Sequence, residues 1–277
     1  MTIVGFGALP AAVGAYPASY IQLSQHAIVG RRSVCSRTEW QRMPSIADID
    51  RLFLLWINQP AGRNRVLDGL VYDISDAQLL KGGLFLAAYW WLWFERKGQQ
   101  RRDVVVAMVA GILTAVLSRL LQVVLPFHQR PLHSPGIGLH MPLTVDPETL
   151  NTFSSFPSDH AMLFFALAVP LWNRSRWLGA AAMLWTLLVI CAPRIYLGYH
   201  YPSDVLAGAV LGILCMVALS RLVARTGFPT RAVHFADFHP GAFYPLAFVL
   251  SFELATLFAD TRHLLLDAMR LGKMLIA

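Results

Sequence analysis

The chain has 277 residues, of which 56% are hydrophobic and only 14% are charged, and its mean hydropathy is +0.51. A soluble protein usually has about a quarter of its residues charged, so this composition argues against a soluble domain and indicates a membrane protein. The net charge of +7 does not indicate nucleic-acid binding, because the basic residues fall in short loops between apolar segments, where anionic lipid headgroups explain them. The three cysteines are scattered and form neither a disulfide framework nor a metal-ligand pattern.

The first 45 residues predict a poorly defined N-terminal extension. Their basic run follows the apolar stretches, whereas a signal peptide has its basic residues first. The next segment, 46–58, is apolar with flanking acids and predicts a helix lying at the membrane surface. Residues 46–260 then form one membrane-embedded domain, and 261–277 an amphipathic C-terminal tail.

Six apolar windows approach or exceed the roughly 20 residues that a helix needs to cross the hydrocarbon core. They predict an all-α fold, a bundle of about six transmembrane helices. The expected spans are residues 79–95, 103–125, 158–172, 177–197, 203–222 and 241–259.

The loops between these windows predict an orientation. Lys and Arg gather in 95–102, in 173–176 and in 221–231, and these three stretches share one side of the membrane if the six spans alternate. Basic loops mark the cytoplasmic side. We therefore expect a protein of the cell's inner (cytoplasmic) membrane whose remaining polar clusters face the periplasm or exterior.

One of those outward clusters contains His200 and Asp204, four residues apart. A carboxylate at this spacing can accept a proton from one ring nitrogen and leave the other nitrogen free to attack phosphorus. The same pair is also typical of an interfacial histidine followed by an acid in the first turn of a helix, so alone it is a weak signal.

A second cluster, Pro157-Ser158-Asp159-His160, opens the span at 158–172. Ser158 is a good N-cap, and the free N–H groups of a helix start bind anions. His160, one turn in, is placed to protonate a leaving oxygen. The alternative is ordinary helix capping beside an interfacial histidine.

Two arginines complete the pattern. Arg130 precedes Pro131 after the second span, and Arg194 lies in the apolar end of the fourth. The planar guanidinium fork matches phosphate oxygens. Either arginine alone could anchor a headgroup, but a charge inside an apolar span end costs a few kcal/mol unless an anion accompanies it.

In these residues the chain resembles the type-2 phosphatidate phosphatase superfamily, whose motifs are K-x-x-x-x-x-x-R-P, P-S-G-H and S-R-x-x-x-x-x-H-x-x-x-D. The resemblance covers about residues 48–225. It implies a membrane-embedded phosphatase domain in which His200 is the nucleophile that becomes phosphohistidine, Asp204 orients it and His160 is the general acid. The phosphate would be bound by Arg130, Ser158 and Arg194.

The chain departs from these motifs at three positions. Val123 stands where the first motif has lysine; Lys81 is the candidate substitute, and Arg119 is less favoured because it lies nearly two turns below Pro126. Pro193 replaces the serine of the third motif. Asp159 replaces the glycine of the second and is counted with the substrate-binding residues. The Asp159 form resembles the bacterial undecaprenyl-diphosphate phosphatases associated with bacitracin resistance, which act outside the cytoplasmic membrane during cell-wall synthesis.

The resemblance therefore implies hydrolysis of the terminal phosphate of a polyprenyl (undecaprenyl) diphosphate. No cofactor and no metal are expected, because Asp146 and Glu148 are the only acids near the clusters besides Asp159 and Asp204, too few for a Mg²⁺ cage. These motifs concern the phosphate and do not specify the lipid tail of the substrate. Phosphatidate, phosphatidylglycerophosphate or lipid A, transfer to a sugar, and a non-catalytic lipid-binding or transport protein remain alternatives, and the oligomeric state is not predicted.

Overall fold

The computed structural model describes residues 45–95, 98–259 and 261, and this part of the chain folds into helices and loops without a strand. The all-helical prediction is confirmed. The helices are α1 (Ile46–Asn58), α2 (Arg65–Asp76), α3 (Leu84–Glu95), α4 (Gln99–Val124), α5 (Asp159–Arg174), α6 (Arg176–Trp185), α7 (Ala192–Tyr196), α8 (Pro202–Arg225), α9 (Phe228–Phe238) and α10 (Pro240–Ala255). Short π-helical segments, Leu79–Gly83 and Thr186–Cys191, lead into α3 and join α6 to α7.

Three helical stretches are long and apolar enough to cross a membrane: α4, the continuous run Arg176–Tyr196 through α6 and α7, and α8. They match three of the expected spans. The other three, at 79–95, 158–172 and 241–259, correspond to the shorter helices α3, α5 and α10.

Two helices, α2 and α9, were not expected from the sequence. Neither contains the long apolar run that predicts a membrane span. Local capping signals mark both starts: the Asn64 side chain accepts hydrogen bonds from the first turn of α2, and Pro229 stands in the first turn of α9. The expected extension at 1–45 and the expected tail at 261–277 lie, except for Ser45 and Thr261, outside the described residues.

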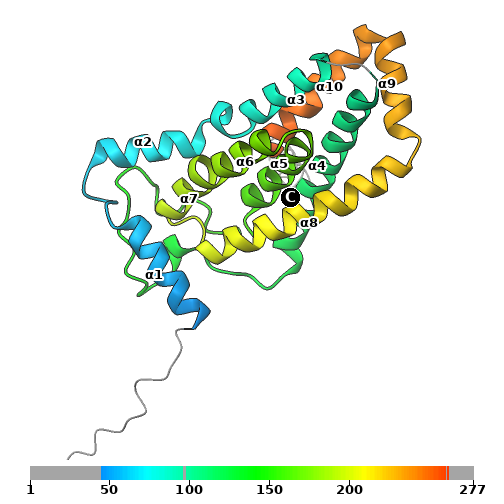
Figure 1. Cartoon of the computed structure of the whole chain (residues 1–277). Helices are drawn as coiled ribbons and strands as arrows, with labels where there is room; N and C mark the ends of the chain where they lie inside the picture. Colours follow the sequence, from blue (N-terminus) through cyan, green and yellow to red (C-terminus); the bar gives the residue numbers. More distant parts are fainter. Residues whose placement is uncertain (1–44, 96–97, 260, 262–277) are drawn as a thin grey trace, which may run out of the picture. The chain divides into compact units, whose positions relative to one another are not determined.

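The centre of the bundle is α5, which packs against α4, α6 and α8 (Figure 1). Glycines allow its closest contact with α8. A Cβ at Gly208 would lie 2.5 Å from the carbonyl oxygen of Ser158, and one at Gly212 would lie 2.0 Å from that of Met162. This close approach holds the start of α5 against the start of α8, which is where the polar clusters lie.

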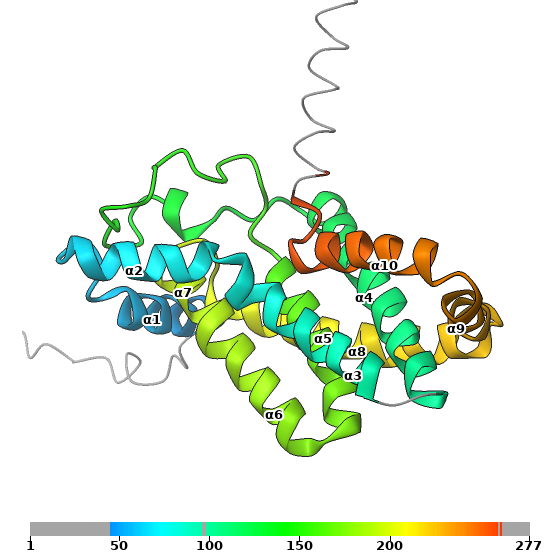
Figure 2. The same ribbon diagram turned by 90° about the horizontal axis from the view of Figure 1, so that it is seen from above.

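The basic loops gather at the opposite end of the bundle. There, Arg102 donates to the carbonyl oxygen of Ala224 at 2.9 Å, and Arg174 lies 3.8 Å from Glu95. These contacts join the start of α4, the end of α8, the end of α3 and the end of α5. The long connection 125–157, green in Figure 2, passes over the other end beside α2 and α7.

The expected surface helix, 46–58, is α1. It begins with a capping box between Ser45 and Asp48 and packs against α7 and α8. Leu54 is fully buried on this side, while Trp56 on the other side is exposed. The helix therefore anchors the starts of the site-bearing helices while leaving an apolar face uncovered.

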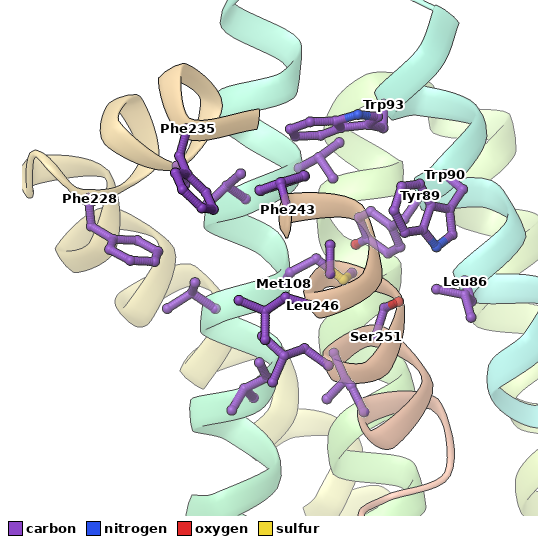
Figure 3. A pocket seen from close by; sticks show the side chains of 18 of the residues that line it. Leu86, Tyr89, Trp90, Trp93, Met108, Phe228, Phe235, Phe243, Leu246 and Ser251 are labelled. Carbon is purple, nitrogen blue, oxygen red and sulfur yellow. The ribbon is translucent and has the colours of Figure 1, made fainter. Parts of the chain in front are cut away.

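An apolar pocket of about 460 Å³ lies among α3, α4, α9 and α10 (Figure 3). Aromatic side chains line much of it, including Trp90, Trp93, Phe235 and Phe243. None of the site residues expected from the sequence borders this pocket, so the chemistry must be sought at the polar end of α5 and α8.

Candidate active site

His200 lies in the loop between α7 and α8 and is almost completely buried. Its Nδ1 is 2.8 Å from the carbonyl oxygen of Ser155. Because a carbonyl oxygen only accepts hydrogen bonds, we assign the proton to Nδ1, which leaves Nε2 unprotonated. Burial lowers the pKa of this imidazole, and the charge of Arg130 lowers it further, so the neutral, nucleophilic form is favoured.

Asp204 supports this histidine mainly through its charge. Its Oδ2 is 3.8 Å from His200 Nδ1 and accepts a hydrogen bond from the backbone N–H of Tyr201 at 2.8 Å. The sequence predicted that Asp204 fixes the tautomer, but in the structure the carbonyl of Ser155 makes that hydrogen bond. A backbone acceptor of this kind leaves no signal in side-chain motifs.

His128 is a further partner of the same carboxylate that the sequence did not assign. Its Nδ1 lies 3.4 Å from Asp204 Oδ1 and 2.7 Å from the hydroxyl of Ser155. The nearby carboxylate raises the pKa of His128, whose side chain is half exposed. His128 therefore stands between solvent and the Asp204–His200 pair.

The second cluster begins α5 as expected. Ser158 is the N-cap, fully buried, and its hydroxyl accepts from the N–H of Ala161 at 3.5 Å. Its own N–H donates to the backbone oxygen of Asp204 at 3.1 Å, which ties the start of α5 to the start of α8. His160, in the first turn, thereby comes to the same end of the bundle as His200.

Arg130 is buried and joins two stretches of the connection 125–157 to the loop between α7 and α8. Its guanidinium donates to the carbonyl oxygens of Phe153 at 3.1 Å, Ser154 at 3.1 Å and Tyr199 at 2.7 Å. One terminal nitrogen, Nη1, is also 3.5 Å from His200 Nε2. Burial lowers the pKa of Arg130 to about 10, so it remains a cation at neutral pH beside the free imidazole nitrogen.

Arg194, in α7, is also buried, and Nη2 donates to the carbonyl oxygen of Ser75 at 3.4 Å. Its Nε has no hydrogen-bond partner among the described residues. A buried donor without a partner carries a cost that a bound anion would remove. The sequence prediction that this guanidinium requires an anion is in keeping with this geometry.

Lys81, the candidate for the missing motif lysine, is buried in the π-helical segment before α3. It is close enough to Arg194, Asp159 and His160 for their charges to act on one another. Val123, in contrast, is 82% exposed, whereas the side chain of Lys81 is buried.

Asp159 is buried, and its carboxylate contacts two side chains: Arg119 Nη2 through Oδ2 at 2.7 Å and His160 Nδ1 through Oδ1 at 2.7 Å. The structure therefore brings all the residues expected from the sequence to one end of the bundle. It also brings Arg119, the less favoured candidate for the motif lysine, into contact with Asp159, and it adds His128 and Ser155. Within the described residues no three His, Cys, Asp or Glu side chains cluster as a metal site requires, and metal independence remains a prediction.

Comparison with known proteins shows the family to which the chain belongs. Residues 127–228 match the PAP2 superfamily. Over 151 residues the chain is 30% identical to undecaprenyl-diphosphatase BcrC of Bacillus subtilis (strain 168), covering 54% of this chain and 72% of that protein. It is 27% identical to lipid A 1-diphosphate synthase of Escherichia coli (strain K12) over 156 residues, 54% of this chain and 61% of that one. The crystal structure of Aquifex aeolicus LpxE is similar at 22% identity and a TM-score of 0.43, over 61% of this chain and 93% of that chain.

The apolar helical fold and these similarities define a membrane hydrolase. The chain belongs to the PAP2 superfamily and is a phosphatase.

Proposed function

We propose that this PAP2 phosphatase removes the terminal phosphate of a polyprenyl diphosphate, such as undecaprenyl diphosphate, through a phosphohistidine on His200. One observation carries the proposal: the unprotonated Nε2 of His200 lies 3.5 Å from Nη1 of the buried Arg130 guanidinium, in a cluster that also contains a second buried arginine. A nucleophile beside fixed cations suits attack on a phosphate. The similarity to undecaprenyl-diphosphatase BcrC supports the choice of lipid.

The first chemical step joins His200 Nε2 to the terminal phosphorus and breaks the bond to the bridging oxygen. Arg130, Arg194 and Lys81 offset the negative charge of the phosphoryl oxygens. His160 gives its proton to the departing oxygen, so that the lipid monophosphate leaves. In the second step water attacks the phosphohistidine, His160 takes the proton from that water, and inorganic phosphate is released.

An apolar groove of about 450 Å³ adjoins this cluster and suits a lipid tail. Its lining includes Leu80 and Pro193, which are the sequence neighbours of Lys81 and Arg194. The other lining residues come from α1, α2, the end of α6, the π-helical segment before α7 and α7 itself. A substrate with its phosphate at the cations can therefore lay its apolar chain along the helices.

We infer that the site faces the outside of the cell membrane. It lies at the end of the bundle opposite Arg102, Arg174 and Arg225, which occupy the basic loops and helix ends. Such loops favour the cytoplasm. An outward site fits a lipid carrier that is dephosphorylated after it has delivered its cargo across the membrane.

The low pKa of His200 makes a prediction about acid tolerance. Protonation inactivates the nucleophile, and a buried imidazole resists protonation, so the acidic limb of kcat/KM is expected below about pH 6.5, the ordinary imidazole value. Because His160 must carry a proton to act as the acid, the rate should fall again at alkaline pH. A kcat/KM profile whose acidic limb lies above about pH 7 would contradict the assignment of His200 as the nucleophile.

A substitution that fills the groove should act on long lipids alone. Val189→Trp narrows the groove, and we expect it to raise KM for undecaprenyl diphosphate about 10-fold and to leave hydrolysis of p-nitrophenyl phosphate unchanged. Leu184→Trp, at an exposed position of α6 outside the groove, is the matched control and should change neither. Equal losses on both substrates from Val189→Trp would argue against a tail groove.

The experiment that tests the lipid assignment is a substrate panel with purified protein in detergent. Undecaprenyl diphosphate, phosphatidate, phosphatidylglycerophosphate and lipid A are compared by phosphate release. The proposal requires a kcat/KM for undecaprenyl diphosphate far above the others. A preference for lipid A would replace the substrate but keep the chemistry, and phosphate release from none of them would leave a lipid-binding or transport protein as the better account.

A further inference from the structure

The carboxylate of Asp159 lies between the His160 ring and the Arg119 guanidinium at the start of α5. Its Oδ1 is 2.7 Å from the His160 ring Nδ1 and 2.8 Å from the His160 backbone nitrogen, and its Oδ2 is 2.7 Å from Arg119 Nη2. We propose that Asp159 is a positioning residue that holds the Nδ1 proton of His160 and orients its ring, and that Arg119 in turn fixes Asp159. This inference rests on the phosphatase activity proposed above.

The contacts around Asp159 form a continuous chain from α4 to α5. Arg119 also donates from Nη1 to the Gln122 side-chain oxygen at 2.9 Å, and Gln122 donates to the carbonyl oxygen of Pro157 at 2.9 Å. Both ends of the arrangement are therefore anchored to elements that border the site. Both carboxylate oxygens of Asp159 are occupied by these partners, so the binding of substrate by Asp159, expected from the sequence, is replaced here by a positioning role.

The hydrogen bond fixes which ring nitrogen can exchange a proton with the substrate. Since the carboxylate accepts a hydrogen from Nδ1, this nitrogen keeps its proton, and Nε2 is left as the atom that donates and accepts. In the first step the imidazolium gives its Nε2 proton to the leaving oxygen and becomes neutral. In the second step Nε2 takes a proton from the attacking water, which restores the imidazolium and releases phosphate.

The charges facing His160 explain why a carboxylate is needed there. Burial is the largest effect that lowers the pKa of the ring, and the charges of Arg194 from α7 and Lys81 from the segment before α3 lower it as well. Asp159, on the same helix as His160, acts in the opposite direction, and Arg119 from α4 contacts only Asp159 among these groups. Without the carboxylate, two buried cations would favour loss of the proton that the first step requires.

A leaving-group comparison separates this role from a structural one. The full chain and its variants are assayed in detergent with octyl phosphate, whose alkoxide leaves poorly without a proton, and with p-nitrophenyl phosphate, whose phenoxide leaves well. We expect Asp159→Asn to lower kcat/KM for octyl phosphate at least about 10-fold and for p-nitrophenyl phosphate less than about 3-fold. The alkaline limb for octyl phosphate should move to lower pH. Asp159→Gly, which removes the side chain entirely, is expected to show the same contrast.

Two controls sharpen the comparison. Asp146→Asn, an exposed acid of the connection 125–157, should change neither rate. In a His160→Ala background Asp159→Asn should have no further effect on either rate, because the imidazole ring that Asp159 orients is absent. Equal slowing of both substrates with an unmoved alkaline limb, or additive losses with His160→Ala, would overturn the proposal. A preference for another lipid in the substrate panel would overturn the substrate assignment and leave this contrast intact.

Discussion

Replacing His200 by alanine is expected to lower kcat by about 10³-fold or more, because the covalent step loses its nucleophile. The loss should be similar for undecaprenyl diphosphate and for p-nitrophenyl phosphate, since both would pass through the same phosphoenzyme. Phosphate release by the purified variant measures it. Thermal unfolding in detergent should confirm that the variant remains folded.

The matched control for this experiment is His234→Ala. His234 is exposed on α9, where it stacks on Phe238. We expect full activity from this variant. If His200→Ala retained more than about a tenth of the wild-type kcat, nucleophilic attack by this ring would be ruled out.

The second large effect is expected at Arg194. Arg194→Met should lower kcat/KM by about 10²-fold to 10³-fold, because a fixed cation that faces the developing charge is lost. The thermal stability of the Arg194→Met variant should not fall. The guanidinium is buried with one donor unsatisfied among the described residues, and an apolar side chain of similar length removes that cost.

Ligand-dependent unfolding gives the direct readout for Arg194. Inorganic phosphate at millimolar concentration should raise the midpoint temperature of unfolding of the wild-type protein, since a ligand that binds only the folded state stabilises it. The same addition should leave Arg194→Met almost unchanged. Arg225→Met, at the opposite end of α8, should behave as wild type in both assays. An Arg194→Met variant that remains fully active, or that is still stabilised by phosphate, would contradict an anion site here.

Much of the fold could be predicted from the sequence because the bilayer imposes a length on its helices. Three runs are long and apolar, and proline or polar residues flank them. They form α4, the stretch from α6 to α7, and α8. The helix α2 escaped prediction because its polar residues interrupt every apolar run. Its contacts with α7 are long-range and could not be read from local pattern.

In the candidate site, too, some residues could be predicted from the sequence and others could not. His160, Arg194 and His200 were found because motif spacing places each at the polar end of a helix. The groups that hold them could not be found in this way. Ser155 acts on His200 through its backbone oxygen, and Arg119 reaches Asp159 only because α4 packs beside the start of α5.

The central claim is that the phosphoryl group passes through His200. A single turnover with ³²P-labelled undecaprenyl diphosphate in EDTA, quenched in base within the lifetime of the intermediate, tests it most directly. The account predicts an acid-labile label that maps to His200 and disappears in His200→Ala. A label on another residue, or product release in the first turnover that stops completely when EDTA removes divalent metal, would contradict it.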